Sequence, residues 1–427
     1  MPIETKLNQI SQKLHDRLIT TIRDLVRIPS ENTPPHGSES GCQQYLAERC
    51  QQLGLQTDLY ELSSVPELTA HPVFRHQRDY RNRPNLAAKL PGKGGGKSLL
   101  LSGHIDTVPR GSEPWRYDPF GAVVDGRRLY GLGANDMKGG IAASLIAIEA
   151  ILEAGVNLRG EVIFETVVDE EFGGVNGTLA ARLRGYNADA AIITEPSQNI
   201  ICPAQMGGHI VHITLRSQAG GILEQDKKDF HVTDQLHYVL GEIKNFARLR
   251  QQQVKSHPLY LHNHDPVPVW ILKVNCGGWG TNEPTTVPTI CRIELYWQHL
   301  PDEQLADISA EFFSWFEAMI AARPELFLIK PEVKFVMEWL PGSAIAKDMS
   351  LVQQLAATFS DVTGQAPVIQ GFDAPCDMFV FHQHFQTPAL LFGPIGGNTH
   401  QPDEWVDLPS AQNVMGTLAR FIFRWCA

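Results

Sequence analysis

Seven acidic or histidine side chains lie just beyond short apolar runs, and together they have the chemistry to bind divalent metal ions and to move a proton. They are His104, Asp106, Asp136, Glu170, Glu171, Glu195 and His400. Several of them follow runs such as 99–101, 162–164 and 190–193, which have the composition of buried strands. Because ligands bind at the carboxyl ends of the strands in open α/β sheets, we expect these side chains to converge on one metal site.

The ligand types in this set favour two metal ions over one. Carboxylate oxygen and imidazole nitrogen suit hard or borderline divalent cations. Five such ligands exceed what one catalytic zinc with an open position takes, but they suit two ions that share a carboxylate. Asp136 is the best candidate for that bridge, because it stands in the glycine-rich segment 131–140, where backbones can approach closely. The expected ligands are His104, Asp136, Glu171, Glu195 and His400.

Two further carboxylates have the spacing to assist the metal ligands. A hydrolase needs a base that takes the proton from the attacking water and passes it to the leaving amine. Glu170 precedes Glu171, and neighbouring side chains at an extended strand end point apart, so one can bind metal while the other faces substrate. Asp106 follows His104 by two residues, a spacing that lets its carboxylate orient the imidazole.

Composition excludes several classes of protein. A length of 427 residues predicts two domains, and a net charge of −11 argues against a nucleic-acid surface. No apolar run approaches membrane-spanning length, and the start of the sequence lacks an apolar secretory core. The seven cysteines are widely spaced without a Cys-x-x-Cys pair, which predicts free thiols in a reducing cytoplasm rather than a disulfide frame or a thiolate zinc site.

The order of apolar patterns predicts an α/β first domain, a mostly parallel sheet flanked by helices. Alternating strand and helix patterns are typical of such a sheet. Residues 56–97 read as a loop-rich segment. The expected helices are 5–27, 39–53, 138–154 and 176–184, and the expected strands are 98–103, 161–168 and 189–194.

A different pattern begins after Pro203 and predicts a smaller α+β domain inserted into the first. Its expected order is a strand at 209–216, a helix near 231–250, strands near 269–275 and 289–297, and a helix near 302–321. The β/α pattern of the first domain is expected to resume near 333. The sequence therefore predicts a first domain from residues 1–203 and 331–427, and an inserted domain of residues 204–330.

Five motifs surround the expected site residues: Gly103-His104-Ile105-Asp106, Gly133-Ala134-Asn135-Asp136-Met137-Lys138-Gly139-Gly140, Asp169-Glu170-Glu171, Thr194-Glu195-Pro196 and His400-Gln401-Pro402-Asp403-Glu404. Together they resemble those of the di-zinc deacylase and peptidase family, which includes acetylornithine deacetylase, succinyl-diaminopimelate desuccinylase, aminoacylase and glutamate carboxypeptidase. The resemblance covers nearly the whole chain, although Leu132 stands where many members have arginine.

The resemblance implies a role for each matching residue. Asp136 would bridge two divalent ions, zinc by preference with cobalt or manganese as alternatives, and the Asp136–Met137 peptide bond would be cis. His104 and Glu195 would bind one ion, and Glu171 and His400 the other. Glu170 would be the general base and Asp106 the orienting carboxylate. The inserted domain would be a lid of the kind that often forms a homodimer.

The lid departs from the family pattern. Gly221 falls where many members carry the histidine that stabilises the oxyanion, and Thr285-Thr286 replaces an asparagine before Val287-Pro288. No arginine stands shortly before Pro301, and the segment Gly371-Phe372-Asp373-Ala374 differs from the family's Gly-x-Thr-Asp-Ala. Losing one oxyanion donor typically costs about 10²–10³ in turnover. His209, His212 and His231 are expected to be ordinary surface residues rather than replacements.

The resulting hypothesis is a cytoplasmic, metal-dependent deacylase that hydrolyses the amide bond of a small N-acyl amino acid or related N-acyl amine. The expected partner is this small-molecule substrate, with neither nucleic acid nor membrane. Two alternatives stay open. One is a catalytically weak homologue that binds metal and a small ligand through the altered lid, and the other is a dipeptidase or exopeptidase. Glu170 favours an enzyme, because a pure binding protein needs no base.

Overall fold

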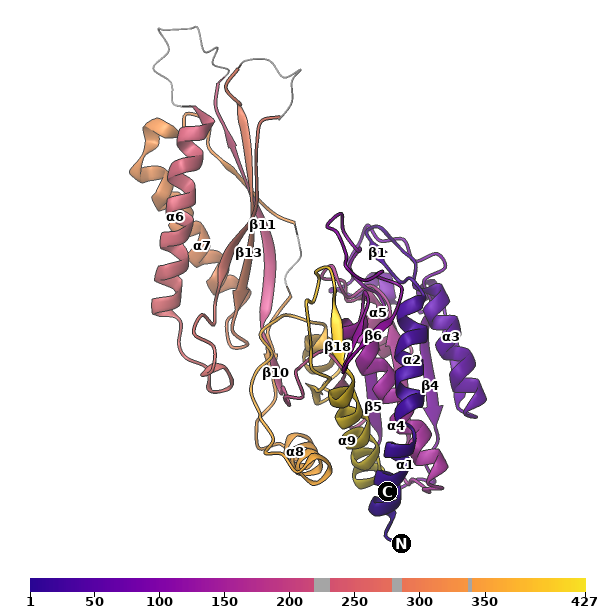
Figure 1. Cartoon of the computed structure of the whole chain (residues 1–427). Coiled ribbons are helices and arrows are strands. Elements are labelled where there is room, and N and C mark those ends of the chain that lie inside the picture. The colour runs from indigo at the N-terminus through magenta and orange to yellow at the C-terminus, as the bar shows by residue number, and fades with distance from the viewer. Residues whose placement is uncertain (219–230, 279–285, 337–339) are drawn as a thin grey trace. The chain divides into compact units, whose positions relative to one another are not determined.

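The computed structural model describes residues 1–218, 231–278, 286–336 and 340–427. The chain forms two compact units (Figure 1). The first contains Met1–Ala204, Ala344–Phe372 and Asp377–Ala427, and the second contains Gln205–Ser343 and Asp373–Cys376. The segment 331–343 was expected to return to the first domain, but it belongs to the second unit. Its strand β14 (Glu332–Phe335) pairs with β11 (Gly207–Arg216), which explains the difference.

A six-stranded sheet forms the centre of the first unit. Its strand order is β16-β9-β5-β8-β4-β3. The pairs β16–β9, β9–β5 and β5–β8 are parallel, whereas β8–β4 and β4–β3 are antiparallel. The strands are β3 (Gln56–Tyr60), β4 (Asn85–Leu90), β5 (Leu99–His104), β8 (Val162–Val167), β9 (Ala191–Ile193) and β16 (Ala389–Leu391).

Two of these strands fall in the segment 56–97, which the sequence indicated as loop-rich. β4 is buried along its first four residues because it pairs with β8 on one side and β3 on the other. Its short apolar pattern, Asn85-Leu86-Ala87-Ala88, is too weak to be recognised without those partners. The sheet in the structure is therefore mostly parallel, as expected, with an antiparallel edge that the sequence did not indicate.

Helices flank this sheet, and their sequences explain how deeply each is buried. α4 is apolar on all sides and is buried from Gly139 to Ile151, as expected for a helix packed between a sheet and other helices. The predicted single helix 5–27 is instead two helices that meet at Leu14. The helices are α1 (Ile3–Lys13), α2 (His15–Arg27), α3 (Ser40–Gln52), α4 (Gly139–Glu153), α5 (Asn176–Leu183), α8 (Ser350–Thr363) and α9 (Leu408–Cys426).

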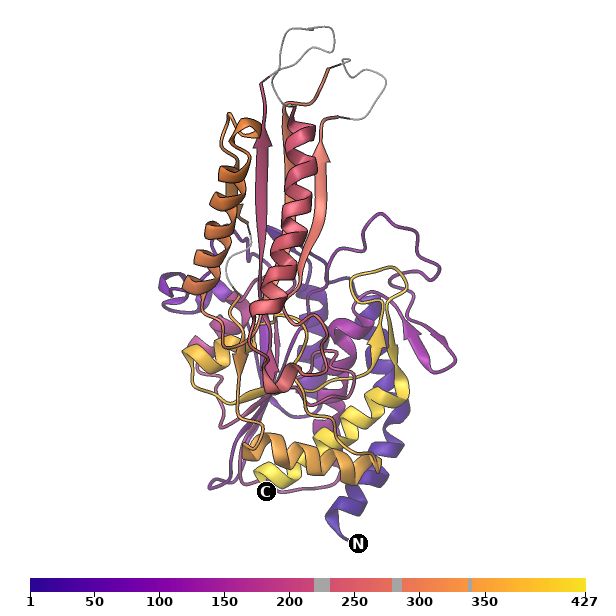
Figure 2. The ribbon, with the colours of Figure 1, turned by 90° about the vertical axis from the view of Figure 1, so that its left-hand side faces the viewer.

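The second unit is an antiparallel four-stranded sheet with two helices packed on one face (Figure 2). The strand order is β12-β13-β11-β14. The alternation predicted for 209–216 is present, because Val211, Ile213 and Leu215 are buried against the helices. The remaining elements are β12 (Val269–Cys276), β13 (Ile290–His299), α6 (Val232–Gln253) and α7 (Leu305–Ala322). Within the described ranges, no helix is long and apolar enough to cross a membrane.

Candidate metal centre

The expected ligands come from the carboxyl ends of the parallel strands and from the loop before α4. His104 is the last residue of β5, Glu171 follows β8, and Glu195 follows β9. Asp136 lies in the turn Ala134–Lys138, which leads directly into α4. His400 lies in the loop that follows β16. The sheet thus brings together side chains that are almost 300 positions apart in the sequence.

Asp136 lies between two sets of ligands. One oxygen, Oδ1, lies 3.0 Å from His104 Nε2, which is also 3.7 Å from Glu195 Oε1. The other, Oδ2, lies 3.5 Å from His400 Nε2, which is 2.8 Å from Glu171 Oε2. One ligand atom each from His104, Asp136 and Glu171 also lies within 4.8 Å of the other two. The donor types and this two-sided arrangement fit a pair of divalent cations that share the Asp136 carboxylate.

Glu404 holds the loop that carries Asp136. Its carboxylate accepts hydrogen bonds from the backbone N–H groups of Gly133, Asn135 and Asp136, at 2.8, 2.8 and 2.9 Å. Gly133 has a φ of +77°, a left-handed conformation that glycine adopts at little cost and that turns the loop toward Glu404. Burial raises the pKa of Glu404 to about 8 despite these hydrogen bonds. Glu404 is part of the motif His400-Gln401-Pro402-Asp403-Glu404, but the sequence alone did not indicate this role for it.

Lys138 anchors the other side of the same loop. Its ammonium is buried and donates to the backbone carbonyls of Leu25 and Ile28 at the end of α2, each at 3.0 Å. A cation is favourable at a helix C-terminus, where carbonyl groups lack helical partners. The Asp136–Met137 peptide bond between these anchors is cis, which confirms the sequence-based expectation.

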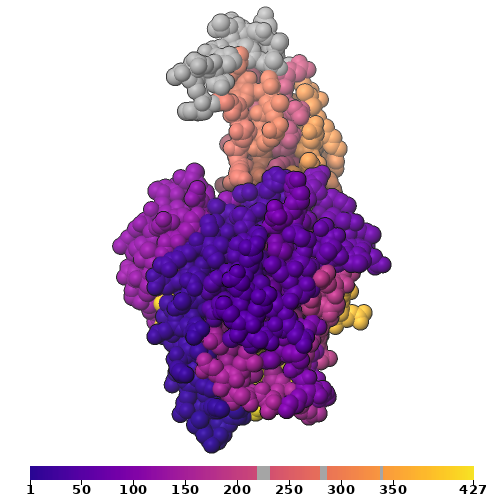
Figure 3. Space-filling model, turned by 90° about the vertical axis from the view of Figure 1, so that its right-hand side faces the viewer, coloured from indigo at the N-terminus to yellow at the C-terminus, as the bar shows by residue number. Residues whose placement is uncertain are grey.

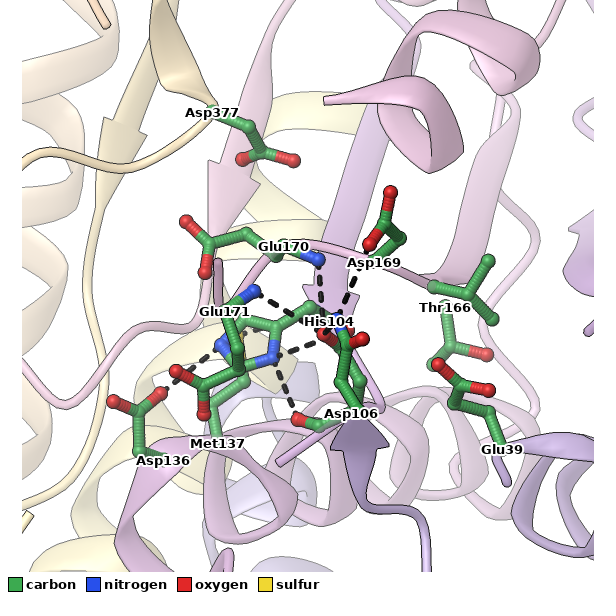
Figure 4. Close-up of polar contacts among 12 residues, drawn as sticks. Glu39, His104, Asp106, Asp136, Met137, Thr166, Asp169, Glu170, Glu171 and Asp377 are labelled. Atoms are coloured by element: carbon green, nitrogen blue, oxygen red, sulfur yellow. Dashed lines mark hydrogen bonds and ion pairs between the residues drawn. The ribbon is translucent and has the colours of Figure 1, made fainter. Parts of the chain in front are cut away.

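Asp106 organises the turn that carries both glutamates (Figure 4). Its Oδ2 accepts hydrogen bonds from the backbone N–H groups of Glu170 at 2.9 Å and Glu171 at 3.1 Å. Its Oδ1 lies 3.7 Å from His104 Nδ1, whereas its backbone carbonyl oxygen lies 2.9 Å from that nitrogen. Asp106 therefore supports the imidazole through its main chain and the two glutamates through its side chain.

Burial and charge together set the ionisation of the site. Burial raises the pKa of Glu195 to about 7 and raises the pKa of Glu170 well above its ordinary value. Burial alone would lower the pKa of His104, but the charge of Glu195 and the hydrogen bond to Asp136 outweigh it and raise that pKa. Burial opposes ionisation of Asp136, yet hydrogen bonds from the two histidines keep its pKa below the ordinary value.

Asp377 is a further acidic residue near the site, and no sequence motif indicated it. It lies on the same side as Glu170 in the close-up view (Figure 4). Its carboxylate accepts a hydrogen bond from the Thr178 hydroxyl. Burial raises its pKa, and its charge also raises the pKa of Glu170. The only sequence signal was an acidic residue within an otherwise apolar segment, Cys376-Asp377-Met378-Phe379.

Three of the histidines of the second unit, His209, His212 and His231, were expected to be surface residues, and this expectation is wrong for His209. His209 is not a surface residue, because its ring is buried against Trp297 and Phe335. His212 Nε2 lies 2.8 Å from Glu294 Oε2, and His231 precedes α6, where its backbone N–H donates to Asp234. Gly221 and Thr285, two positions of the lid pattern, lie outside the described residues.

With this geometry in place, comparison with known proteins identifies the family. Residues 100–424 match the family described as Peptidase family M20/M25/M40. The chain belongs to this family. It is therefore a metal-dependent hydrolase of the class that cleaves amide bonds.

Curated relatives match over nearly the full length. The chain is 28% identical to a succinyl-diaminopimelate desuccinylase from Methylobacterium radiotolerans, covering 95% of this chain and 96% of the relative. It is 26% identical to an N-formyl-4-amino-5-aminomethyl-2-methylpyrimidine deformylase from Halalkalibacterium halodurans, covering 97% and 95%.

Solved structures share the fold. Human carnosine dipeptidase 1 superposes with a TM-score of 0.74 at 16% identity, covering 99% of both chains. A Bacillus subtilis protein described as a dinuclear metal-binding peptidase of the M20 family gives a TM-score of 0.60 at 16% identity, covering 97% of this chain and 99% of the other.

Proposed function

We propose that this chain removes the acyl group from a small N-acyl amine by hydrolysing its amide bond. The observation that carries this proposal is the position of Asp136, whose two carboxylate oxygens face two separate histidine–carboxylate sets. In this proposal His104 and Glu195 hold one divalent ion, and Glu171 and His400 hold the other. Zinc is the expected metal, with cobalt and manganese as alternatives that the same ligands accept.

Two divalent ions bound there would polarise the amide carbonyl and lower the pKa of the attacking water. Glu170 accepts the proton of that water at its carboxylate while the oxygen adds to the carbonyl carbon. Glu170 then donates the proton to the leaving nitrogen as the C–N bond breaks. Its partly desolvated carboxyl group has a raised pKa, which suits a group that must both accept and release a proton.

The altered lid sequence favours a substrate without an α-carboxylate. One relative is a deformylase acting on an aminopyrimidine derivative, and the other removes succinyl groups. Because the chain lacks an arginine shortly before Pro301 and has glycine at 221, we expect poor turnover of acetylornithine and succinyl-diaminopimelate. N-formyl and N-acetyl amines that carry no carboxylate are the preferred candidates.

A hydrolysis screen tests this proposal. N-formyl, N-acetyl and N-succinyl amines, with and without an α-carboxylate, would be incubated beside dipeptides in the presence of zinc or cobalt. Release of free amine from the acyl compounds but not from the dipeptides is expected. Hydrolysis of dipeptides alone would favour the second candidate function, a dipeptidase, which the fold shared with human carnosine dipeptidase 1 keeps open.

Two further features stay predictions. Homodimer formation through the second unit is expected from the family resemblance, and sedimentation of the full chain measures it. A cytoplasmic location is expected from the cysteines, all seven of which are free thiols.

A further inference from the structure

Asp169 is a buried carboxylate that directly precedes Glu170, and several segments of the chain hold it. The Tyr80 hydroxyl donates to its Oδ2 at 2.6 Å, and Asn32 Nδ2 donates to its Oδ1 at 3.2 Å. Arg78 Nε and Arg83 Nη2 lie 3.6 and 3.7 Å from Oδ1. A fully buried carboxylate with this many donors is fixed in place, and it is the anchor of the turn that follows.

The backbone at Asp169 needs such an anchor. Its φ is +66°, in the left-handed region that residues with a Cβ atom seldom adopt. In the close-up view the side chain of Asp169 extends to the opposite side from that of Glu170 (Figure 4). Holding the first side chain in its pocket of donors therefore sets the direction in which the second projects.

Asn32 links the Asp169 carboxylate to the Asp106 carboxylate, which binds the backbone of the two glutamates. The same Nδ2 atom lies 2.9 Å from Asp106 Oδ2 and 3.2 Å from Asp169 Oδ1. Asp106 Oδ2 is also the acceptor for the Glu170 and Glu171 backbone N–H groups. The turn Asp169–Glu171 is thus held at one end through the Asp169 side chain and at the other through the backbone N–H groups of Glu170 and Glu171. Asn32 donates to both carboxylates that hold it.

A second layer supports the donors. Arg83 forms a buried ion pair with Glu39, with contacts between 2.5 and 3.1 Å, and Asn176 Nδ2 donates to the Tyr80 hydroxyl at 2.5 Å. The N-terminal part of the chain, which carries Asn32, Glu39 and Tyr80, covers one face of the first unit (Figure 3). Tyr80 and Arg83, which help to hold Asp169, lie in the segment 56–97 that the sequence indicated as loop-rich.

We propose that Asn32, Tyr80 and Asp169 form a positioning network that sets the orientation of Glu170 and Glu171 without touching the substrate. As far as turnover is concerned, this rests on the proposed function, in which Glu170 moves the proton. Misplacement of a reacting group by about 1 Å can cost roughly 10²-fold in rate, so small losses in this network are measurable.

A matched pair of tyrosine variants tests the network. Tyr80→Phe removes one hydroxyl that donates to Asp169, and Tyr45→Phe removes one that donates to Asp24 at 2.9 Å, between α3 and α2. We expect Tyr80→Phe to lower kcat by about 10-fold or more, with KM and bound metal unchanged. Tyr45→Phe should leave kcat unchanged, although it should lower thermal stability about as much as Tyr80→Phe does. Equal kcat values for both variants, or a kcat loss that only follows metal loss, would overturn the proposal.

A second readout does not depend on activity. Amide hydrogen exchange of peptides spanning 168–172 in the intact protein reports whether Asp106 still holds the Glu170 and Glu171 N–H groups. Tyr80→Phe and Asn32→Ala should exchange these amides at least about 10-fold faster, and Tyr45→Phe should not. Unchanged exchange in the first two variants would refute the network. If exchange responds but the wild-type protein hydrolyses no amide, the network stands and the proposed function fails.

Discussion

His104 takes its orientation from the main chain of Asp106 and not from the carboxylate. The imidazole Nδ1 lies 2.9 Å from the Asp106 carbonyl oxygen and 3.7 Å from Oδ1. Because a carbonyl can only accept, Nδ1 carries the hydrogen, and Nε2 is the nitrogen that faces Asp136 and Glu195. The carboxylate of Asp106 is then available to the backbone of the Glu170–Glu171 turn.

This division of roles predicts the effect of Asp106→Asn. The substitution removes the negative charge from the carboxylate that accepts three hydrogen bonds. The free energy of unfolding should therefore fall by about 2 kcal/mol, and kcat should fall as well. The tautomer of His104 should stay the same, because its carbonyl partner remains. Nitrogen-15 NMR of the histidine rings measures this directly. A switch of His104 to the other tautomer would mean that the carboxylate orients the ring after all.

Asp136→Ala should remove both metal ions, because the two oxygens of Asp136 face different ligand sets. Metal analysis of protein purified without chelator should approach two equivalents in the wild type and none in this variant. Glu195→Gln should lose mainly one ion, since Glu195 lies near His104. Asp189, which accepts from Ser98 at the surface, offers a control, and Asp189→Ala should retain both ions. Full occupancy in Asp136→Ala would contradict the bridging role.

Glu170→Gln should lower turnover by at least about 10²-fold, because the amide cannot accept the proton of the attacking water. Bound metal should be unchanged, since Glu170 is not among the proposed ligands. Glu171→Gln, one residue away, should lose metal as well as activity. Near-normal turnover in Glu170→Gln would show that another group moves the proton, and Asp377 would be the first to examine.

The stability of the second unit should fall at mildly acidic pH because of His209. Burial, with the nearby charge of Arg250, lowers the pKa of His209 to about 4. Unfolded histidine has a pKa of about 6.5, so between these values the unfolded chain binds a proton that the folded chain does not. The contribution of the neutral His209 ring to the free energy of unfolding is therefore fully present above about pH 6.5. It is lost as the pH falls toward 4, and the total loss is about 3 kcal/mol.

Urea unfolding followed by tryptophan fluorescence measures this loss, because the ring centroids of Trp297 and His209 lie 4.6 Å apart. His209→Phe keeps a flat ring in the core and removes the titrating group. The difference in unfolding free energy between pH 7 and pH 4.5 should be smaller in this variant than in the wild type. Parallel pH curves for the two proteins would assign the acid sensitivity to other groups, of which buried His299 is the nearest.

The sequence by itself determined the chemistry of the site and most of the elements that carry it. His104, Asp136, Glu171, Glu195 and His400 each follow a local signal, an apolar strand or a glycine-rich turn, and the end of a parallel strand is a fixed place in such a sheet. The helix at 139–153 and the strand at 162–167 could also be predicted, because their apolar runs are longer than those of loops.

Only the tertiary structure decided which polar groups support those ligands. Glu404, Asn32 and Tyr80 contact residues 89 to 271 positions away along the chain, and no local pattern records such a contact. The two roles of Asp106 likewise depend on how closely the turn at 169–171 approaches β5. Strand β4 and the return point of the chain near 343 were missed for the same reason, because pairing partners define them more than their own composition does.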